Sequence, residues 1–587
     1  MAPRSNTQSL TILAQDPAVR ANGALLLEQV DVPQEYLSGG PTGYRIKVVD
    51  FDASANVCYQ PRQYEFTPAG IVKDPFAPPA KTLTPKQRQA YEQRLLQDPT
   101  FHAQNVYAIA MRTLSRFEFA LGRRVAWGFG GHQLHIVPHA FAEANAYYSE
   151  ADRALMFGYF VGKSGKHVFT CLSHDIVAHE TTHAILDGLR THYTDPSGPD
   201  QAGFHEGFAD IVALLSVFSL KPVVDRALSM GEAVVRKDGM RLVKASQLTP
   251  EALSQTILFG VGKEFGQQLE GFRANALRRS VGLKPSTRYL ASQEYEEPHD
   301  RGEVLAGAIL RSFLELWSAR IKQLGTFGRG LYNLAAVVEE GAKVADHLLT
   351  IVIRAMDYTP SVDLEFADFL SAMLTVDAEV VPDDSRFSYR DVILKTFRAY
   401  GIKPPPGTTD PDGCWQHFAR NGDIQYRKTN FESMLRDPEE VFRFVWENRE
   451  VLNVDPRGYT KVVSVRPSIR QGPDGFTLRE TVCEYVQVAE LFAAELEGIL
   501  RIKRPAGMSS RQRVTAYGGA VLVFDQYGSI KYHIERPLAD ATRQSKRLEY
   551  LWRTGAIERP GRDRNQFADL HRARAMREFS TAQPEGV

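Results

Sequence analysis

The chain has 587 residues, more than one hydrophobic core normally organises, so we expect two to four domains. Basic and acidic residues number 70 each, and a net charge of zero gives the whole chain no electrostatic attraction to nucleic acid or to an anionic membrane. The longest apolar run, 211–220, is about half as long as a membrane span, and no signal-peptide core lies in the N-terminal segment. We therefore expect a cytoplasmic protein with no membrane partner, for which nucleic acid is a poor candidate ligand.

The cysteines lie far apart in the sequence, and no two of them form a CxxC pair. Four thiols are too few to cross-link a chain of this length, which argues against a disulfide framework. We expect small buried hydrophobic residues with no metal-binding role at all four positions: Cys58, Cys171, Cys414 and Cys483.

Residues 1–95 form a predicted β-rich region, in which 44–52 is the clearest strand candidate. A proline-rich stretch then connects this region to a helical segment, because proline interrupts both helices and sheets. Apolar residues at helical spacing predict the first long helix over 101–121.

Two strong helices are predicted next. The segment 173–190 has an apolar stripe at helical spacing and offers Ser173 as an N-cap. The segment 204–220 is almost wholly apolar after Asp210, which is typical of a buried helix. Four further helices are predicted over 303–323, 331–355, 363–374 and 388–400.

The stretch 403–413 is rich in proline and glycine and predicts a linker. Beyond it, 414–545 has the texture of a separate α+β module, with two β-hairpins and a short helix between them: 460–488, 518–535 and 488–500. The tail 546–587 is rich in arginine, and the arginine-rich stretch already begins at Arg543. We favour a solvated helix face there over contact with an acidic partner or nucleic acid.

The central motif is HETTH, which runs from His179 to His183. Residues four apart on a helix face the same way, so the two imidazoles could grip one metal ion. Glu180 then lies beside the ion but off the ligand axis, where a general base for a water molecule belongs. The alternative is an accidental spacing of two core histidines.

The helix that follows strengthens the metal interpretation. Catalytic zinc needs three protein ligands and one open position. HEGFAD supplies Glu206 as a third ligand, and Asp210 lies one turn later on the same face, where it can orient a ligand histidine. We therefore predict one zinc ion held by His179, His183 and Glu206.

These two helices resemble those of the thermolysin-like gluzincins, whose motifs read HExxHxxxD and ExxxD. The matching residues are His179, Glu180, His183 and Asp187 in the first motif and Glu206 and Asp210 in the second. The resemblance implies an α+β fold over 96–402, a two-lobed zincin domain with a mixed β-sheet upper lobe and an all-helical lower lobe. It also implies that Asp210 hydrogen-bonds a ligand histidine and that Asp187 supports the site.

Upstream, 144–160 resembles the family's active-site edge strand and the strand that follows it. In that pattern an Asn-Ala-aromatic-aromatic segment pairs with the extended substrate backbone by strand addition. The residues that would bind substrate in this way are Asn145, Ala146, Tyr147 and Tyr148. An ordinary surface strand or turn is the alternative.

The family also has a tyrosine and a histidine that donate hydrogen bonds to the developing oxyanion. Tyr193 is the best tyrosine candidate in this sequence. For the histidine we choose His299, which Glu297 or Asp300 could orient. The local spacing would instead put Glu303 where the family has its histidine, so His299 could equally be structural.

Secreted members of the family have a propeptide and acidic calcium sites, and neither is evident here, which points to an intracellular relative. The aminopeptidase branch uses a GxMEN segment that this sequence lacks, so an endopeptidase is favoured. We therefore expect a zinc metalloendopeptidase with a peptide or protein substrate, whose C-terminal module could bind a protein partner.

The alternative comes from a different class of protein: a non-catalytic regulatory or interaction protein whose peptidase-like domain holds zinc structurally. The two hypotheses differ at the fourth zinc position. An enzyme keeps water there, whereas a structural site fills the position with a protein side chain.

Overall fold

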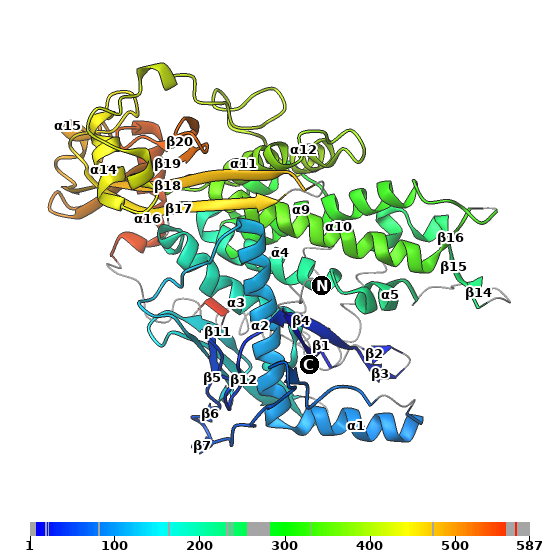
Figure 1. Cartoon of the computed structure of the whole chain (residues 1–587). Helices are drawn as coiled ribbons and strands as arrows, with labels where there is room; N and C mark the ends of the chain where they lie inside the picture. The colour runs from blue at the N-terminus through cyan, green and yellow to red at the C-terminus, as the bar shows by residue number, and fades with distance from the viewer. Residues whose placement is uncertain are drawn as a thin grey trace, which may run out of the picture.

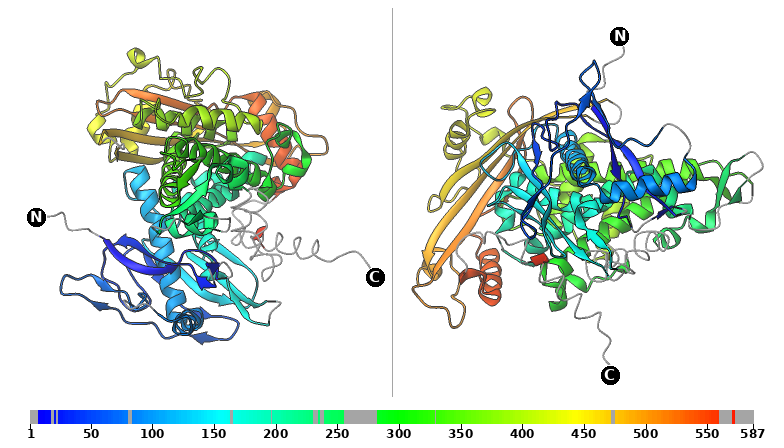
Figure 2. Two further views of the ribbon diagram at one scale, coloured as in Figure 1. Left: turned by 90° about the vertical axis from the view of Figure 1, so that its right-hand side faces the viewer. Right: turned by 90° about the horizontal axis from the view of Figure 1, so that it is seen from below.

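The computed structural model shows a mixed α+β protein, with helices between N-terminal strands at one end and a C-terminal sheet at the other (Figure 1 and Figure 2). None of the helices that the structure describes is both long enough and apolar enough to cross a membrane. The structure describes residues 7–17, 20–21, 23–79, 83–162, 165–195, 197–229, 234–235, 239–254, 282–328, 330–471, 475–558 and 570–571.

The N-terminal region is rich in strands, as predicted. Its longest strands, β1 and β4, pair antiparallel with Leu10 opposite Val30, and both of these side chains are buried. One strand of this region, Ile46–Val48, joins the sheet described next. The other strands of the region are β1 (Thr7–Leu13), β2 (Arg20–Ala21), β3 (Ala24–Leu25), β4 (Leu27–Pro33), β6 (Phe51–Asp52), β7 (Val57–Cys58), β8 (Glu65–Phe66) and β9 (Val72–Lys73).

A mixed sheet with the order β11-β12-β10-β5 lies next to these strands, and β13 also pairs with β12. β10 runs parallel to β12 and β5, whereas β11 is antiparallel to β12 and forms the edge. The bounds are β5 (Ile46–Val48), β10 (Leu134–Phe141), β11 (Ala146–Ser149), β12 (Ala154–Val161) and β13 (His167–Phe169). Because β5 comes from the segment before residue 95, that segment and the chain that follows it share one sheet.

The predicted helices are present with small changes at their ends. α2 begins after Asp98, whose side chain accepts from the Thr100 N–H, but Ser173 does not cap α3 in this way, because its hydroxyl donates to Asp175. The bounds are α1 (Pro85–Gln97), α2 (Pro99–Leu121), α3 (His174–Leu189), α4 (Pro199–Phe218), α5 (Lys221–Ser229), α9 (Pro298–Ile321), α10 (Leu334–Ala355), α11 (Phe366–Val380) and α12 (Tyr389–Ala399). A small sheet beside α10 contains β14 (Val234–Val235), β15 (Arg241–Lys244) and β16 (Leu331–Asn333).

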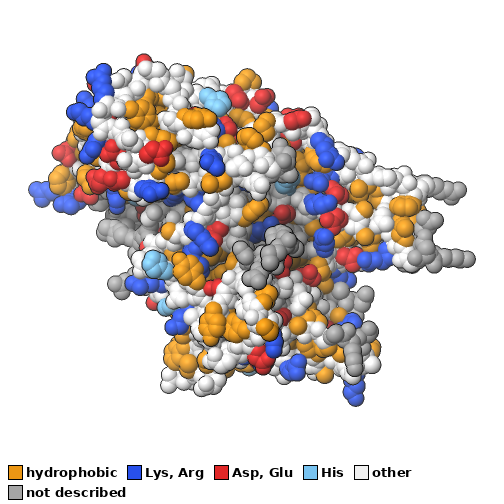
Figure 3. All heavy atoms as spheres, in the orientation of Figure 1, with side chains coloured by type: hydrophobic (Ala, Val, Ile, Leu, Met, Phe, Trp, Pro, Cys, Tyr) orange, Lys and Arg blue, Asp and Glu red, His pale blue; other side chains and the backbone are white. Residues whose placement is uncertain are grey.

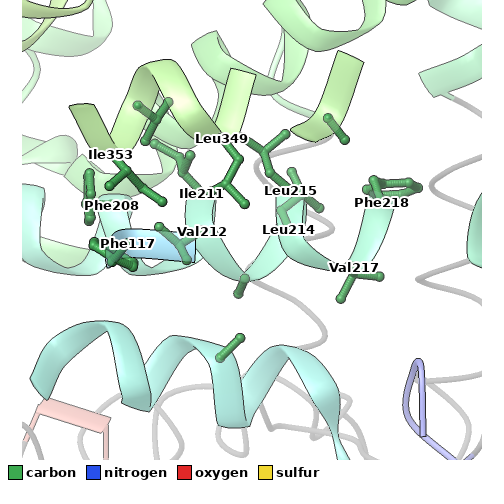
Figure 4. Packing of buried hydrophobic residues seen from close by; sticks show 14 of the residues in the cluster. Phe117, Phe208, Ile211, Val212, Leu214, Leu215, Val217, Phe218, Leu349 and Ile353 are labelled. Atoms are coloured by element: carbon green, nitrogen blue, oxygen red, sulfur yellow. The ribbon is translucent and has the colours of Figure 1, made fainter. Parts of the chain in front are cut away.

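Helix α4 is buried almost all round and forms the centre of the main core. Figure 4 shows its apolar side chains, such as Ile211 and Leu215, packed against Leu349 and Ile353 of α10. Phe117 of α2 reaches the same layer and makes an edge contact with Phe208. This burial on every side explains why the sequence of α4 is nearly free of polar residues after Asp210.

Two glycines let α4 approach α9 closely. A Cβ atom on Gly207 would lie 2.8 Å from the carbonyl oxygen of Gly302, closer than real Cβ contacts come. The two backbones therefore cross with no side chain between them. Gly207 is adjacent to Glu206, so this crossing fixes the position of that carboxylate relative to α9.

The C-terminal part of the chain forms an antiparallel sheet with the order β17-β18-β19-β20. The helix predicted over 488–500 is wrong for most of its length, because β18 continues to Phe492 and pairs with β19 up to Arg513. Only a short helix, α15, remains there. The bounds are α13 (Phe431–Met434), α14 (Pro438–Glu447), β17 (Tyr459–Gln471), β18 (Thr477–Phe492), α15 (Leu496–Ile499), β19 (Arg513–Phe524), β20 (Ile530–Arg536) and α16 (Ala541–Thr554).

Two other predictions need correction. Cys58 is exposed, whereas the other three cysteines are buried as expected. The start of the arginine-rich tail is not a solvated face, because Arg543 and Arg547 of α16 are largely buried and pair with Asp363. Burial lowers the pKa of Arg547 to about 10. Apart from residues 570–571, the tail beyond 558 lies outside the described residues.

Buried ion pairs join the C-terminal sheet to the helices. Arg470, whose side chain is fully buried in β17, pairs with Asp357 and Glu480. Arg190 at the end of α3 pairs with Glu484 of β18 at 2.6 Å. Burial alone would raise the pKa of Asp357, but the guanidiniums of Arg123 and Arg470 hold it well below its ordinary value. A partner removed from such a network leaves a charge without compensation.

The outer surface has a different character. On the face shown in Figure 3, acidic and basic side chains are interspersed, and neither sign dominates a large area. This agrees with the balanced composition and gives this face no electrostatic preference for a polyanion.

We predict that Arg470→Met lowers the free energy of unfolding by about 3 kcal/mol, because it leaves two buried carboxylates with fewer cations. Arg443→Met is the matched control: its pair with Glu440 is exposed on the Arg443 side and is worth less than about 1 kcal/mol. Urea unfolding of both variants measures the difference. Equal midpoints for the two variants would show that the buried network does not hold the sheet to the helices.

Candidate metal centre

Helix α3 presents the HETTH motif to the interior of the protein. His179, Glu180 and His183 are each at most 2% exposed. The hydroxyls of the intervening Thr181 and Thr182 donate hydrogen bonds to the backbone carbonyls one turn earlier, so both hydroxyls are satisfied in the core. The two histidines lie one turn apart, and their Nε2 atoms are 2.8 Å from each other.

Helix α4 supplies the carboxylate that faces these rings. Glu206 Oε2 lies 3.4 Å from Nε2 of His179, and Oε1 lies 3.5 Å from Nε2 of His183. In the described part of the chain, no group donates a hydrogen bond of ordinary geometry to either oxygen. A buried carboxylate that lacks donors is costly unless a cation lies beside it.

A fourth ligating group comes from a part of the sequence where we predicted none. Nε2 of His571 lies 3.4 Å from Glu206 Oε1, and His571 is 4% exposed. Figure 1 shows residues 570–571 as the short red segment beside α3 and β11. One ligand atom from each of His179, His183, Glu206 and His571 lies within 4.8 Å of all the others.

These distances fit a zinc ion. Zinc binds nitrogen and oxygen at about 2.0–2.2 Å in a tetrahedron, which places neighbouring ligand atoms about 3.3–3.5 Å apart. Oε1 of Glu206 lies at about this separation from His183 and His571, and Oε2 lies at about the same separation from His179. The two HETTH nitrogens are closer together, at 2.8 Å. Three imidazoles and one carboxylate are a donor set that zinc accepts.

The outer nitrogens of the rings support the same assignment. Nδ1 of His179 lies 2.8 Å from Asp210, as predicted, and Nδ1 of His183 lies 2.8 Å from Nδ1 of His205. A proton held on the outer nitrogen leaves the lone pair of Nε2 directed at the ion. Burial lowers the pKa of His183 well below its ordinary value, so this ring is neutral, as a ligand must be. His205 was not predicted, although it immediately precedes Glu206 in the sequence.

The predicted general base lies between the ligands and the edge strand. Oε2 of Glu180 accepts a hydrogen bond of 3.1 Å from the backbone N–H of Tyr148 in β11. The carbonyl oxygen of Ala146, in the same strand, accepts a hydrogen bond of 2.8 Å from Nδ1 of His571. The structure thus brings β11, Glu180 and the ligand cluster to one place.

The other two predicted substrate-binding residues lie at the start of β11. Asn145 is buried, and its side-chain oxygen accepts from the N–H of Ala146. Tyr147 is half-buried and stacks on Phe141 with 5.6 Å between the ring centroids. Tyr148 is buried and donates its hydroxyl to Asp187, 3.0 Å away, which gives Asp187 its supporting role: it ties the end of α3 to the edge strand.

His299 belongs to the cluster, at the first turn of α9. Its Nε2 lies 3.5 Å from Glu206 Oε2, and Glu297 holds its Nδ1 at 2.9 Å. Glu297 also caps α9, so the orienting carboxylate is fixed by the helix start. Arg301, two residues later in the same helix, forms an ion pair with Asp200 of α4.

Tyr193 does not reach the site. It is buried against Phe204, and its hydroxyl donates to the carbonyl oxygen of Pro360 at 2.6 Å. This corrects the prediction that Tyr193 stabilises an oxyanion. The cause is the short turn after α3, which is anchored by the buried side chain of Arg190 and directs Tyr193 into the core.

A second buried group of ligating side chains consists of His102, His139 and Cys171. Here hydrogen bonds account for every ring nitrogen: Asp50 binds His139, the carbonyl of Leu96 binds His102, and the two rings bind each other at 2.8 Å. Burial lowers the pKa of His102 to about 3 and raises that of Cys171 well above its ordinary value. These hydrogen bonds and a protonated thiol satisfy this group without a metal.

Comparison with known proteins adds nothing to this geometry, because no family model and no curated protein matches the chain.

We predict that Asp210→Ala lowers the zinc affinity of the protein by about 10–100-fold, because His179 loses the carboxylate that orients its ring. Asp225→Ala is the matched control, since Asp225 pairs with Arg241 on the surface. Competition with a chelating indicator measures both affinities. If Asp210→Ala binds zinc as tightly as the control, Asp210 does not orient a ligand.

Proposed function

We propose that the protein is a zinc-dependent metallopeptidase, and an endopeptidase within that class. The observation that carries the proposal is the position of Glu180, whose carboxylate lies beside the ligand cluster and is held by the backbone of β11. A purely structural zinc site has no use for such a carboxylate. Resemblance of the motifs to thermolysin-like gluzincins supports the same class.

His179, His183 and Glu206 would hold the ion from α3 and α4. Bound there, zinc would act as a Lewis acid toward the scissile carbonyl and would acidify water. Glu180 takes the proton of the attacking water and passes it to the leaving nitrogen, since it is the carboxylate next to both the cluster and the edge strand. His299, oriented by Glu297, donates a hydrogen bond to the developing oxyanion.

The substrate binds along β11. Strand β11 lies at the end of its sheet, beside β12, and an extended peptide adds to a sheet at such a strand. The carbonyl of Ala146 already accepts a hydrogen bond from a group in the site, which shows that it points toward the ligand cluster. Strand addition at this edge would place a peptide bond beside Glu180 and the ligand cluster.

The two-lobed thermolysin-like arrangement is part of the proposal. It is supported by the mixed sheet that contains β11 and by the set of helices, α4 and α9 to α12, on the other side of α3. A cytoplasmic location and a protein partner for the C-terminal sheet stay predictions.

A second candidate function is a non-catalytic zinc-binding protein. The observation that favours it is His571, a protein side chain at the fourth position of the cluster. In that case no open position exists for water, and zinc would serve only to hold the chain together.

We predict that Glu180→Gln keeps one zinc ion per chain but cleaves unfolded casein about 10²–10⁴-fold more slowly, because the water loses its base. This substitution and its control are both made in the His571→Ala protein, called the parent, because His571 contacts Glu180 and the ligand cluster. Glu439→Gln, in the exposed first turn of α14, is the matched control.

Cleavage by Glu180→Gln at the rate of its parent would remove Glu180 from the mechanism. If the parent and both variants bind zinc but none cleaves casein or a peptide library, the second candidate function is favoured.

A further inference from the structure

His571 touches every functional element of the candidate site. Its Nδ1 lies 2.8 Å from the carbonyl oxygen of Ala146 and 3.7 Å from Oε1 of Glu180, and its Nε2 lies 3.4 Å from Glu206. The ring centroid is 5.8 Å from that of His179 and 5.9 Å from that of His299. A side chain with these neighbours lies inside the site and is not simply adjacent to it.

The hydrogen bond to Ala146 fixes the chemistry of the ring. A carbonyl oxygen can only accept, so Nδ1 of His571 carries the proton and donates it. In the neutral ring Nε2 then has a lone pair, and this is the atom that faces Glu206. A backbone carbonyl that holds the outer nitrogen of a histidine is a usual arrangement for a zinc ligand.

The place of His571 is also the place of the proposed substrate. A peptide added to β11 would need the Ala146 carbonyl and the space next to Glu180, and His571 uses both. The ring is 4% exposed, so little room for water or substrate is left around it. Occupation by His571 and occupation by substrate therefore exclude each other.

Helix α16, which precedes His571 in the chain, is held near the start of α9. Arg553 of α16 pairs with Glu296, which lies beside the start of α9 and hence beside Glu297 and His299. Arg543 of the same helix pairs with Asp363. His571 belongs to the same chain as the site, so it competes with substrate as an intramolecular ligand.

From these contacts we propose that His571 is a built-in inhibitor of the peptidase, acting as a removable fourth zinc ligand. The proposal rests on the proposed function, because a latent site requires an active one. Withdrawal of His571 opens one coordination position and removes its contacts with the Ala146 carbonyl and with Glu180, while the three ligands from α3 and α4 stay in place.

The test compares the full-length, zinc-loaded protein with His571→Ala and with the control His132→Ala, which removes an exposed histidine. X-ray absorption at the zinc edge counts the imidazoles bound to zinc, and casein cleavage measures activity. We expect the count to fall from three to two and cleavage to rise about tenfold or more in His571→Ala only. A synthetic peptide of residues 565–577 should inhibit His571→Ala, and the same peptide with His571→Ala should not.

The other outcomes contradict different claims. If the imidazole count is unchanged and all three proteins cleave casein equally, the inhibitory role of His571 is contradicted but the proposed peptidase activity is not. A count that falls from three to two without cleavage by any of the proteins overturns the inhibitor together with the proposed function, because His571 is then a permanent ligand of a structural site.

Discussion

The buried carboxylate of Glu206 is the constraint on which the rest of the site depends. It is 2% exposed, and the described residues give it imidazole nitrogens at 3.4–3.5 Å in place of ordinary hydrogen bonds. Burial alone would raise its pKa, yet the surrounding rings hold it well below its ordinary value, so the group stays charged. A charged carboxylate buried in this way needs positive charge beside it, which a metal ion held by the rings would supply. The close crossing of α4 and α9 at Gly207 and Gly302 holds the Glu206 carboxylate in this position.

The sequence predicted the part of the site that lies on two helices. The spacing of HETTH places His179, Glu180 and His183 on one buried face, because the helical period alone decides which side chains meet. Glu206 and Asp210 followed from the need for a third ligand and an orienting carboxylate. Helical spacing in α3 and α4 does not place His299. The position of His299 depends on the residue at which α9 begins, and the cap at Glu297 sets that start.

The residues that the sequence did not predict depend on tertiary contacts. His571 belongs to no motif, and it contacts Ala146 across a separation of 425 residues, which only the folded chain reveals. Tyr193 was misplaced because the turn after α3 is held by Arg190, whose partner Glu484 lies in the distant C-terminal sheet. The strand β18 was shortened in the prediction because Ala489 to Phe492 read as helix, whereas pairing with β19 decides the matter. Local propensity yields to such pairings.

The most direct test of the account is diffraction from crystals of the purified protein at wavelengths on both sides of the zinc absorption edge. The account predicts one strong anomalous peak per chain, bounded by Nε2 of His179, Nε2 of His183 and a carboxylate oxygen of Glu206. No peak at that position, or a single peak between His102 and His139, would contradict it.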